Sequence, residues 1–229
     1  MTPTTATVRG RLLGPVQLVV GDTEIIPGSA RVRSLLTSLL LRCGQLVPVE
    51  TLIADVWDDQ PPRKARASLH AYTSRLRRDL RGASADETHE ETGGARRLLT
   101  SHAAGYTLAI DPEDVDANVF TRLLDDARER IARGDHSSGR ALLTTALDLW
   151  RGPALAGVAP TSRLTAHARR YEEHRLEALS LRIGADLHLG HADAVIPELR
   201  TLVADHPERP DFHRQLAAAL NRTGASPPH

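Results

Sequence analysis

Hydrophobic positions in the first sixty residues follow a strand pattern and then a helix pattern. Short apolar segments over residues 8–13, 16–20 and 23–26 are separated by Gly-Pro and Gly-Asp turns, which is typical of strands. From Ser29 the apolar residues recur every three to four positions. This spacing predicts one helix that ends near Gly44, followed by a second helix after Pro48 and then an acidic, proline-stiffened loop.

A third helix is predicted over residues 63–81. Leu69, Thr73, Leu76 and Leu80 lie at i, i+4, i+7 and i+11, so they form one narrow stripe that must face a core. The opposite side of this helix carries small and basic residues, which are Lys64, Ala67, Ser68, Ala71, Arg75 and Arg78.

The segment after this helix predicts a loop and a hairpin. Residues 82–95 are polar, acidic and without period, which indicates a mobile loop. Residues 97–100 and 106–110 look like two strands joined through 101–105. Strands, three helices and a hairpin, in this order, predict a winged helix-turn-helix, whose third helix inserts into a DNA groove.

Everything beyond Asp111-Pro112 has helical periodicity. Apolar faces recur from Phe120 to Ile131, from Leu142 to Trp150, from about Ser162 to Leu189, and in two further segments. Short links that contain glycine separate them, which is typical of tetratricopeptide-like helical arrays. We therefore predict an α+β winged helix-turn-helix of OmpR type over residues 1–112 and an all-α tetratricopeptide-like domain over residues 113–229.

Charge is balanced in the whole chain but not along it. The sequence has 29 basic and 29 acidic residues, yet residues 63–81 contain seven Lys or Arg and one acid. Small side chains permit close approach to DNA, and arginines bind phosphates or guanine edges, so this helix is suited to the major groove. A solvated, arginine-rich surface helix is the alternative interpretation of the same segment.

Composition excludes several classes of protein. The single cysteine, Cys43, rules out an internal disulfide and favours the reducing cytoplasm, where we expect it as a small buried side chain. No signal sequence or membrane-spanning run is present, so we expect no membrane partner. Eleven histidines have no metal-ligand spacing, and no GxSxG, P-loop or GxGxxG sequence occurs. We therefore expect no metal, no cofactor and no enzyme.

Short motifs in the predicted order carry a family resemblance over residues 12–222. They are Leu13-Gly14-Pro15-Val16, Arg31 to Leu36, Trp57 with Pro61-Pro62, Leu76-Arg77-Arg78, Gly105 to Leu108, and Leu147 to Leu155. With these residues the chain resembles the Streptomyces antibiotic regulatory protein family. The resemblance implies a transcription activator that binds direct repeats near promoters, recruits RNA polymerase and switches on a secondary-metabolite gene cluster.

The resemblance also implies roles for individual residues. Arg31 and Arg33 match a pair that contacts phosphate, Arg97 and residues 101–105 match the wing, and residues of the third helix match those that meet DNA. The complete predicted DNA-binding set is Arg31, Arg33, Lys64, Arg66, Ser68, His70, Ala71, Arg75, Arg77, Arg78 and Arg97. In the family, one loop contacts RNA polymerase through its sigma factor. The residues that match this loop are Asp58, Asp59, Gln60, Pro61 and Pro62.

Two departures from the family pattern change the expectations. Many relatives carry a polar residue where this chain has Ala67, so base readout there would be lost or replaced by contact with a thymine methyl group. The family's activation domain normally continues for another helix or two beyond residues 217–222, so we expect either a shortened chain or an uncovered last helix face.

A second function remains open from the residues alone. A helical-repeat adaptor that binds a protein, peptide or small effector would also explain the C-terminal half. We expect the DNA-binding form to act as a homodimer or as two molecules side by side on DNA, because one winged helix makes few contacts.

Overall fold

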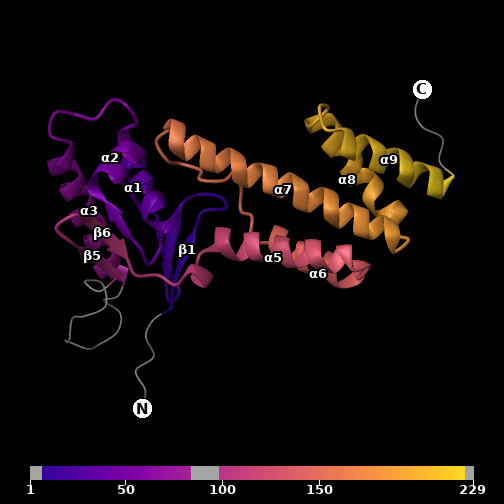
Figure 1. The fold of residues 1–229 in the computed structure, drawn as a ribbon, viewed down its shortest axis with the longest axis horizontal. Helices are drawn as coiled ribbons and strands as arrows, with labels where there is room; N and C mark the ends of the chain where they lie inside the picture. Colours follow the sequence, from indigo (N-terminus) through magenta and orange to yellow (C-terminus); the bar gives the residue numbers. More distant parts are fainter. Residues whose placement is uncertain (1–6, 84–97, 225–229) are drawn as a thin grey trace, which may run out of the picture. The chain divides into compact units, whose positions relative to one another are not determined.

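A computed structural model of the chain describes residues 7–83 and 98–224 (Figure 1). It contains two compact units. Unit one comprises Met1–Val119 with Trp150–Glu172, and unit two comprises Phe120–Leu149 with Glu173–His229. Residues 113–119 and 150–172 therefore pack with the N-terminal part of the chain, and a functional division between residues 112 and 113 stays a prediction.

Unit one begins with an antiparallel sheet in the order β1-β2-β3. Val8 pairs with Val20, and Leu18 pairs with Ile25. The alternation of apolar residues and the glycine turns predicted these three strands correctly. Their bounds are Val8–Arg11 for β1, Gln17–Val20 for β2 and Thr23–Ile25 for β3.

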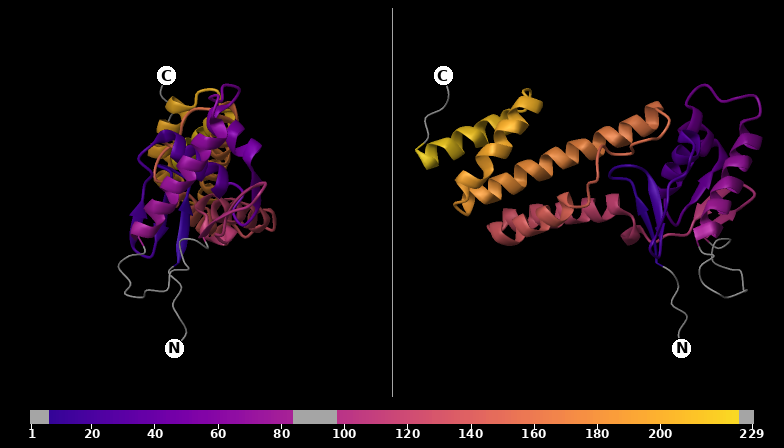
Figure 2. Two further views of the ribbon diagram at one scale, coloured as in Figure 1. Left: turned by 90° about the vertical axis from the view of Figure 1, so that its left-hand side faces the viewer. Right: turned by 180° about the vertical axis from the view of Figure 1, so that it is seen from behind.

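Three helices follow, as the spacing of apolar residues predicts, and the rear view in Figure 2 shows them beside the indigo strands. Leu35 and Leu39 of α1 and Leu52 and Val56 of α2 have no exposed surface, so they form the centre of this core. Burying a leucine side chain contributes about 1.5–3 kcal/mol to folding. The helices are α1 (Ala30–Leu40), α2 (Val49–Trp57) and α3 (Ala65–Ala83).

The third helix begins two residues later than predicted. Arg63 and Lys64 lie in a turn, and the backbone N–H of Ala65 donates to Pro62 O at 2.9 Å. The prolines keep residues 60–62 out of the helix, because a residue that precedes proline is disfavoured in helical conformation and a proline ring fixes φ. The predicted loop at 82–95 lies almost entirely outside the described residues.

A second sheet has the strand order β4-β6-β5. The hairpin of β5 (Leu99–Ser101) and β6 (Gly105–Leu108) confirms the predicted strand pair. Strand β4 (Leu46–Pro48) was not predicted, because three residues are too few to show a period. It pairs with β6 through Val47 and Tyr106, so a long-range partner stabilises it.

Residues 150–156 run beside residues 12–15 within unit one. The N–H of Arg151 donates to Leu13 O at 2.8 Å, and the N–H of Leu155 donates to Leu12 O at 2.9 Å. The prediction that the helix over residues 142–150 reaches Trp150 was therefore wrong, since α6 ends at Leu147. Backbone bonding to a distant segment replaced the last helical turn.

Asp116 fixes the other side of the same segment. Its carboxylate accepts hydrogen bonds from the backbone N–H of Leu12 at 2.7 Å and of Leu13 at 3.1 Å. Arg151 lies 3.4 Å from the same carboxylate. Burial raises the pKa of Asp116, and the two N–H donors and the arginine oppose this effect.

Unit two is entirely helical within its described residues. Its helices α8 and α9 pack closely, and Ile183, Val195, Leu199 and Phe212 lie in one buried cluster. Gly139 of α6 allows the close approach of α5, because a Cβ there would lie 2.5 Å from Ile131 Cγ1. These short-linked helices confirm the predicted tetratricopeptide-like architecture. The bounds are α5 (Asp116–Ala132), α6 (His136–Leu147), α7 (Ser162–His188), α8 (Ala192–Asp205) and α9 (Pro210–Thr223), of which α5 and α7 begin in unit one.

Among the described residues, none of the helices combines the length and the apolar character needed to cross a membrane.

Candidate nucleic-acid interface

Helix α3 is anchored by the apolar stripe that its sequence predicts. Leu69, Thr73, Leu76 and Leu80 are each at most 1% exposed. The Thr73 hydroxyl donates to His70 O at 2.9 Å, so this polar group is satisfied inside the core. The stripe fixes the rotation of the helix about its axis and thereby decides which residues face outward.

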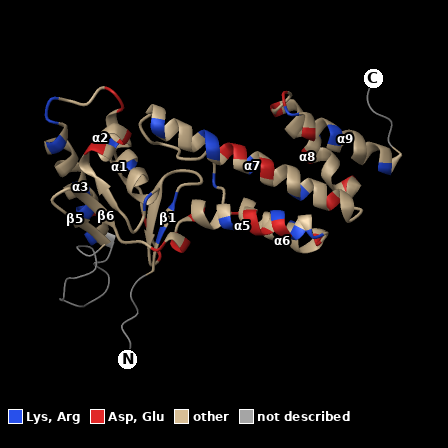
Figure 3. Cartoon of the chain, viewed as in Figure 1, with Lys and Arg blue, Asp and Glu red and all other residues tan. Residues whose placement is uncertain are grey.

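The outward face of α3 is small and basic. Ala67, Ala71, Arg75 and Arg78 are exposed, and Ser68 is half-buried at its edge. Lys and Arg positions are blue along this helix and the turn before it in Figure 3. We call the exposed residues Arg63, Lys64, Arg66, Ala67, His70, Ala71, Arg75, Arg78 and Arg81 the basic face.

Most cations of the basic face have no acidic partner within residues 7–83 and 98–224. Among the described residues, the side chains of Lys64, Arg75 and Arg78 make no hydrogen bond or ion pair, whereas Arg66 forms an exposed salt bridge with Glu50. An exposed pair of this kind contributes little to stability and is easily exchanged for another anion. Within the part of the chain that the structure describes, positive charge on this face is therefore not neutralised by acidic side chains, apart from the pair at Arg66.

Arg77 connects α3 to the hairpin. Its Nε donates to Leu99 O at 3.1 Å, and its Nη2 donates to Ser101 Oγ at 2.6 Å. A groove of about 370 Å³ lies here, lined by Ser74, Arg77, Arg81, Leu99, Thr100 and Ser101. Arg77 thus has an internal role in positioning the hairpin beside α3, in addition to the predicted contact with DNA.

The hairpin end is compact and exposed. The N–H of His102 donates to Gly105 O at 2.8 Å, and the His102 ring lies 3.1 Å from Thr107 Oγ1. Residues 101–104 are exposed, as a wing requires. Arg97, which was predicted to belong to the wing, lies outside the described residues.

Arg31 and Arg33, predicted to contact phosphate, are half-buried and bonded to the protein itself. Arg31 donates to Val56 O of α2. Arg33 donates to Pro27 O at 2.6 Å and to Gly157 O at 2.5 Å. Both guanidinium groups tie the start of α1 to neighbouring segments, so any contact with phosphate would have to use their remaining N–H groups.

Asp58, in the predicted polymerase-contacting loop, also has internal partners. Its carboxylate accepts from the Ser162 hydroxyl at 2.6 Å and from the Ser162 N–H at 2.9 Å, and these bonds lower the pKa of Asp58. Asp59, Gln60, Pro61 and Pro62 are exposed. The accessible part of this loop is therefore residues 59–62.

Trp57 and Tyr106 of unit one are packing groups. Trp57 is 7% exposed and stacks on Tyr72 with ring centroids 5.7 Å apart, and Tyr106 is 8% exposed. Cys43 is buried, and burial raises the pKa of its thiol, so the thiolate is disfavoured.

Two arginines of the basic face were missed as site residues. Arg63 and Arg81 are exposed at the two ends of the face, and Arg81 lines the groove beside the hairpin. Both belong to the seven-cation segment, so its charge count was a sufficient signal to find them.

Comparisons with known proteins match both parts of the chain. Residues 22–108 match the family described as "Transcriptional regulatory protein, C terminal", and residues 115–226 match the "Bacterial transcriptional activator domain". The regulatory protein DnrI of Streptomyces peucetius is 34% identical over 93% of this chain and 77% of its own length. The transcriptional regulator RedD of Streptomyces coelicolor is 35% identical over 93% of this chain and 59% of its own length.

A solved structure has the same architecture. Mycobacterium tuberculosis EmbR, in complex with a low-affinity phosphopeptide, superimposes with a TM-score of 0.84 at 30% identity, over 96% of this chain and 56% of EmbR. The chain thus spans between about half and three quarters of the length of these relatives. The relatives are transcriptional regulators, a class of proteins that is not known as enzymes. The order of the two matched domains and the extent of these similarities show that the chain belongs to the Streptomyces antibiotic regulatory protein family of transcriptional activators.

Proposed function

We propose that the chain activates transcription by inserting the basic face of α3 into the major groove of promoter DNA. The observation that carries this proposal is the set of exposed cations that have no acidic partner in the described part of the chain, Lys64, Arg75 and Arg78 among them, opposite a fully buried stripe. Ala67 and Ala71 leave room for the backbone of the helix to approach the base edges, where a thymine methyl group can contact them. Ser68, His70, Arg66 and Arg77 flank this line, at positions suited to phosphate.

Two molecules are proposed to bind side by side on direct repeats. One winged helix offers a single groove-binding helix and one hairpin, which neutralise only a few phosphates. A second copy on the neighbouring repeat doubles these contacts. The relatives DnrI and RedD are regulators in Streptomyces, and by analogy the target is a secondary-metabolite gene cluster and the location is the cytoplasm.

A gel-shift experiment tests DNA binding against the alternative of a helical adaptor. Promoter DNA is titrated with the full chain at several salt concentrations, and each phosphate neutralised should contribute about −0.9 to the slope of log K against log salt. A specific complex with a steep slope is expected, and two bands of successive occupancy should appear on a site with two repeats. An adaptor would retard neither promoter DNA nor sheared genomic DNA.

The exposed residues 59–62 are proposed to contact RNA polymerase through its sigma factor. Replacing Asp59 and Gln60 together by alanine should lower promoter activation by about fivefold or more, since interface contacts of roughly 1 kcal/mol are lost. DNA affinity should not change, because the two side chains lie outside the basic face. Reporter transcription and gel shifts on the same variant measure the two effects separately.

Asp22→Ala supplies the matched control for this loop. Asp22 is an exposed acid in the turn between β2 and β3 of the same unit. If Asp22→Ala lowers activation as much as the loop variant, the effect is general to acidic charge and the polymerase proposal is wrong.

A further inference from the structure

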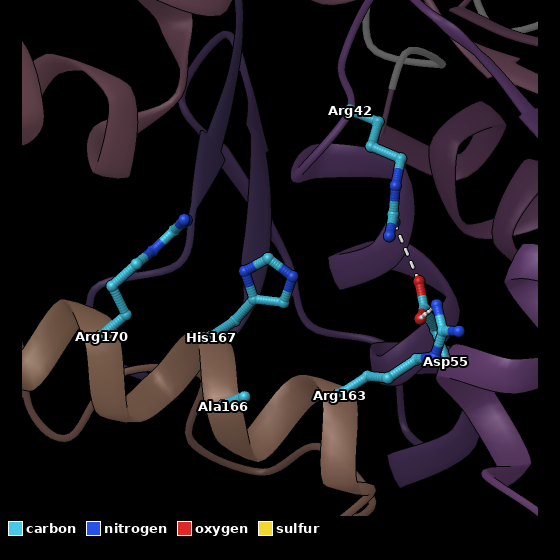
Figure 4. Close-up of a pocket in the computed structure, with 6 residues that line it drawn as sticks. All are labelled: Arg42, Asp55, Arg163, Ala166, His167 and Arg170. Carbon is cyan, nitrogen blue, oxygen red and sulfur yellow. Dashed lines mark hydrogen bonds and ion pairs between the residues drawn. The ribbon is translucent and has the colours of Figure 1, made fainter.

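Unit one contains a pocket that the basic face does not use. Its volume is about 330 Å³, and it lies between the first half of α7 and the α1–α2 part of the winged helix (Figure 4). Its lining residues are Arg42, Asp55, Arg163, Ala166, His167 and Arg170. A volume of this size is at the lower end of the range for small-molecule sites.

A buried carboxylate organises one wall of the pocket. The Asp55 side chain is 2% exposed and accepts hydrogen bonds from Ser38 Oγ at 2.6 Å and from Arg42 Nη1 at 2.8 Å. Arg163 lies 3.8 Å from the other carboxylate oxygen. Asp55 therefore holds two guanidinium groups beside the pocket, and each of them retains N–H groups that do not contact the carboxylate.

The wall on α7 adds two further nitrogen donors. His167 and Arg170 lie one turn apart and extend toward the same side of the helix in Figure 4. Arg170 lies over the Tyr171 ring, 5.5 Å from its centroid, and forms no ion pair among the described residues. Three arginines and one carboxylate give the lining a net charge of about +2 with His167 neutral.

We propose that this pocket binds a small phosphate-bearing ligand. A phosphate monoester is close to a dianion at neutral pH and offers three acceptor oxygens, which match the charge and the N–H donors of the lining. Guanidinium groups bind such oxygens in a forked geometry, and the Asp55 carboxylate orients two of these groups in advance.

His167 links binding to pH. Burial lowers its pKa, and the charges of Arg170 and Arg42 lower it further, whereas Asp55 opposes them; Arg163 also faces the pocket. A bound dianion would favour the protonated imidazole and raise this pKa. By reciprocity, the ligand must bind more tightly as the pH falls through the raised pKa.

The pocket joins segments distant in sequence, because Arg42 follows α1, Asp55 belongs to α2 and the others belong to α7. A bound dianion would fasten α7 to α2, the helix that precedes the basic helix. An effect of this contact on DNA binding rests on the proposed function. Binding of the ligand to the pocket does not depend on it. The two ideas can therefore fail separately.

Calorimetric titration of the full chain tests the pocket without DNA. Sulfate serves as a tetrahedral dianion that does not titrate near neutral pH, pyrophosphate as a phosphate probe, and acetate as a carboxylate, all at constant ionic strength. We expect saturable one-site binding of sulfate and pyrophosphate, with acetate much weaker. Arg170→Gln should weaken binding by about tenfold or more, because a hydrogen bond to a charged group is lost.

Arg169→Gln is the matched control, since Arg169 is the exposed neighbour of Arg170 on α7 and does not line the pocket. It should retain the affinity of the unaltered chain, and the NMR signals of His167 should show a higher pKa in the presence of sulfate. Absence of saturable binding, equal weakening by Arg169→Gln and Arg170→Gln, preferential binding of acetate, or an unmoved His167 pKa would each overturn the proposal.

Discussion

Replacing Arg75 and Arg78 together by alanine is expected to weaken promoter binding by roughly 30- to 1000-fold. Both side chains are exposed on the basic face, and neither makes a hydrogen bond or ion pair with another described residue, so their loss removes no such internal interaction. An arginine that reads a base contributes about 1–3 kcal/mol, and the lost phosphate contact of a second arginine adds to this. Gel shifts at fixed salt measure the loss.

A charge-matched variant tests whether the loss of DNA affinity comes from the basic face itself or from the lower total charge of the protein. Arg9 on β1 and Arg200 on α8 are exposed arginines far from α3 in sequence, and replacing both by alanine removes the same total charge. This control should bind promoter DNA with nearly unchanged affinity. If the two double variants bind equally, the basic face does not contact DNA and the assignment of α3 is wrong.

Replacing Gly105 by alanine should destabilise unit one by roughly 2–4 kcal/mol, because contacts at strand β4 must be broken or strained. A Cβ on Gly105 would lie 2.0 Å from Val47 O and 3.0 Å from Pro48 Cα. These are backbone atoms of the paired strand β4, so no side-chain rotation relieves the overlap. Denaturant unfolding of the variant, followed by the fluorescence of Trp57 and Trp150, which both lie in unit one, measures the change.

The same substitution at Gly82 should have the opposite sign. Gly82 lies in the last turn of α3, where a Cβ would meet no atom within 4 Å. Alanine there should stabilise the helix by about 0.5–1 kcal/mol through its higher helix propensity. If Gly105→Ala is as benign as Gly82→Ala, the close pairing of β4 with β6 is absent in solution.

Local periodicity was sufficient for most of the secondary structure. The leucine stripe of α3 predicted both that a helix forms and which side is buried, because a helix with one apolar stripe has one way to face a core. Periodicity failed where an element depends on hydrogen bonds to a segment that is distant in sequence. Strand β4 exists because β6 pairs with it, and α6 ends at Leu147 because residues 151–156 bond to residues 12–14.

For the candidate site, too, the sequence predicted the local features and missed those that depend on distant segments. It identified the basic face from charge and spacing on one helix, which are local properties. It did not anticipate that Arg31, Arg33 and Asp58 have internal partners, because Val56, Gly157 and Ser162 lie 25, 124 and 104 residues away from them. The same limit hid the pocket, although Arg163, His167 and Arg170 have the i, i+4, i+7 spacing of one helix face.

The sequence by itself determined the order of strands and helices, the rotation of the basic helix and the concentration of positive charge on its outer side, because each depends on neighbours within a few turns. Only the tertiary structure decided which of these charges are available. Whether a guanidinium faces solvent, a backbone carbonyl or a buried carboxylate depends on segments brought together across the chain, and no spacing rule encodes that proximity.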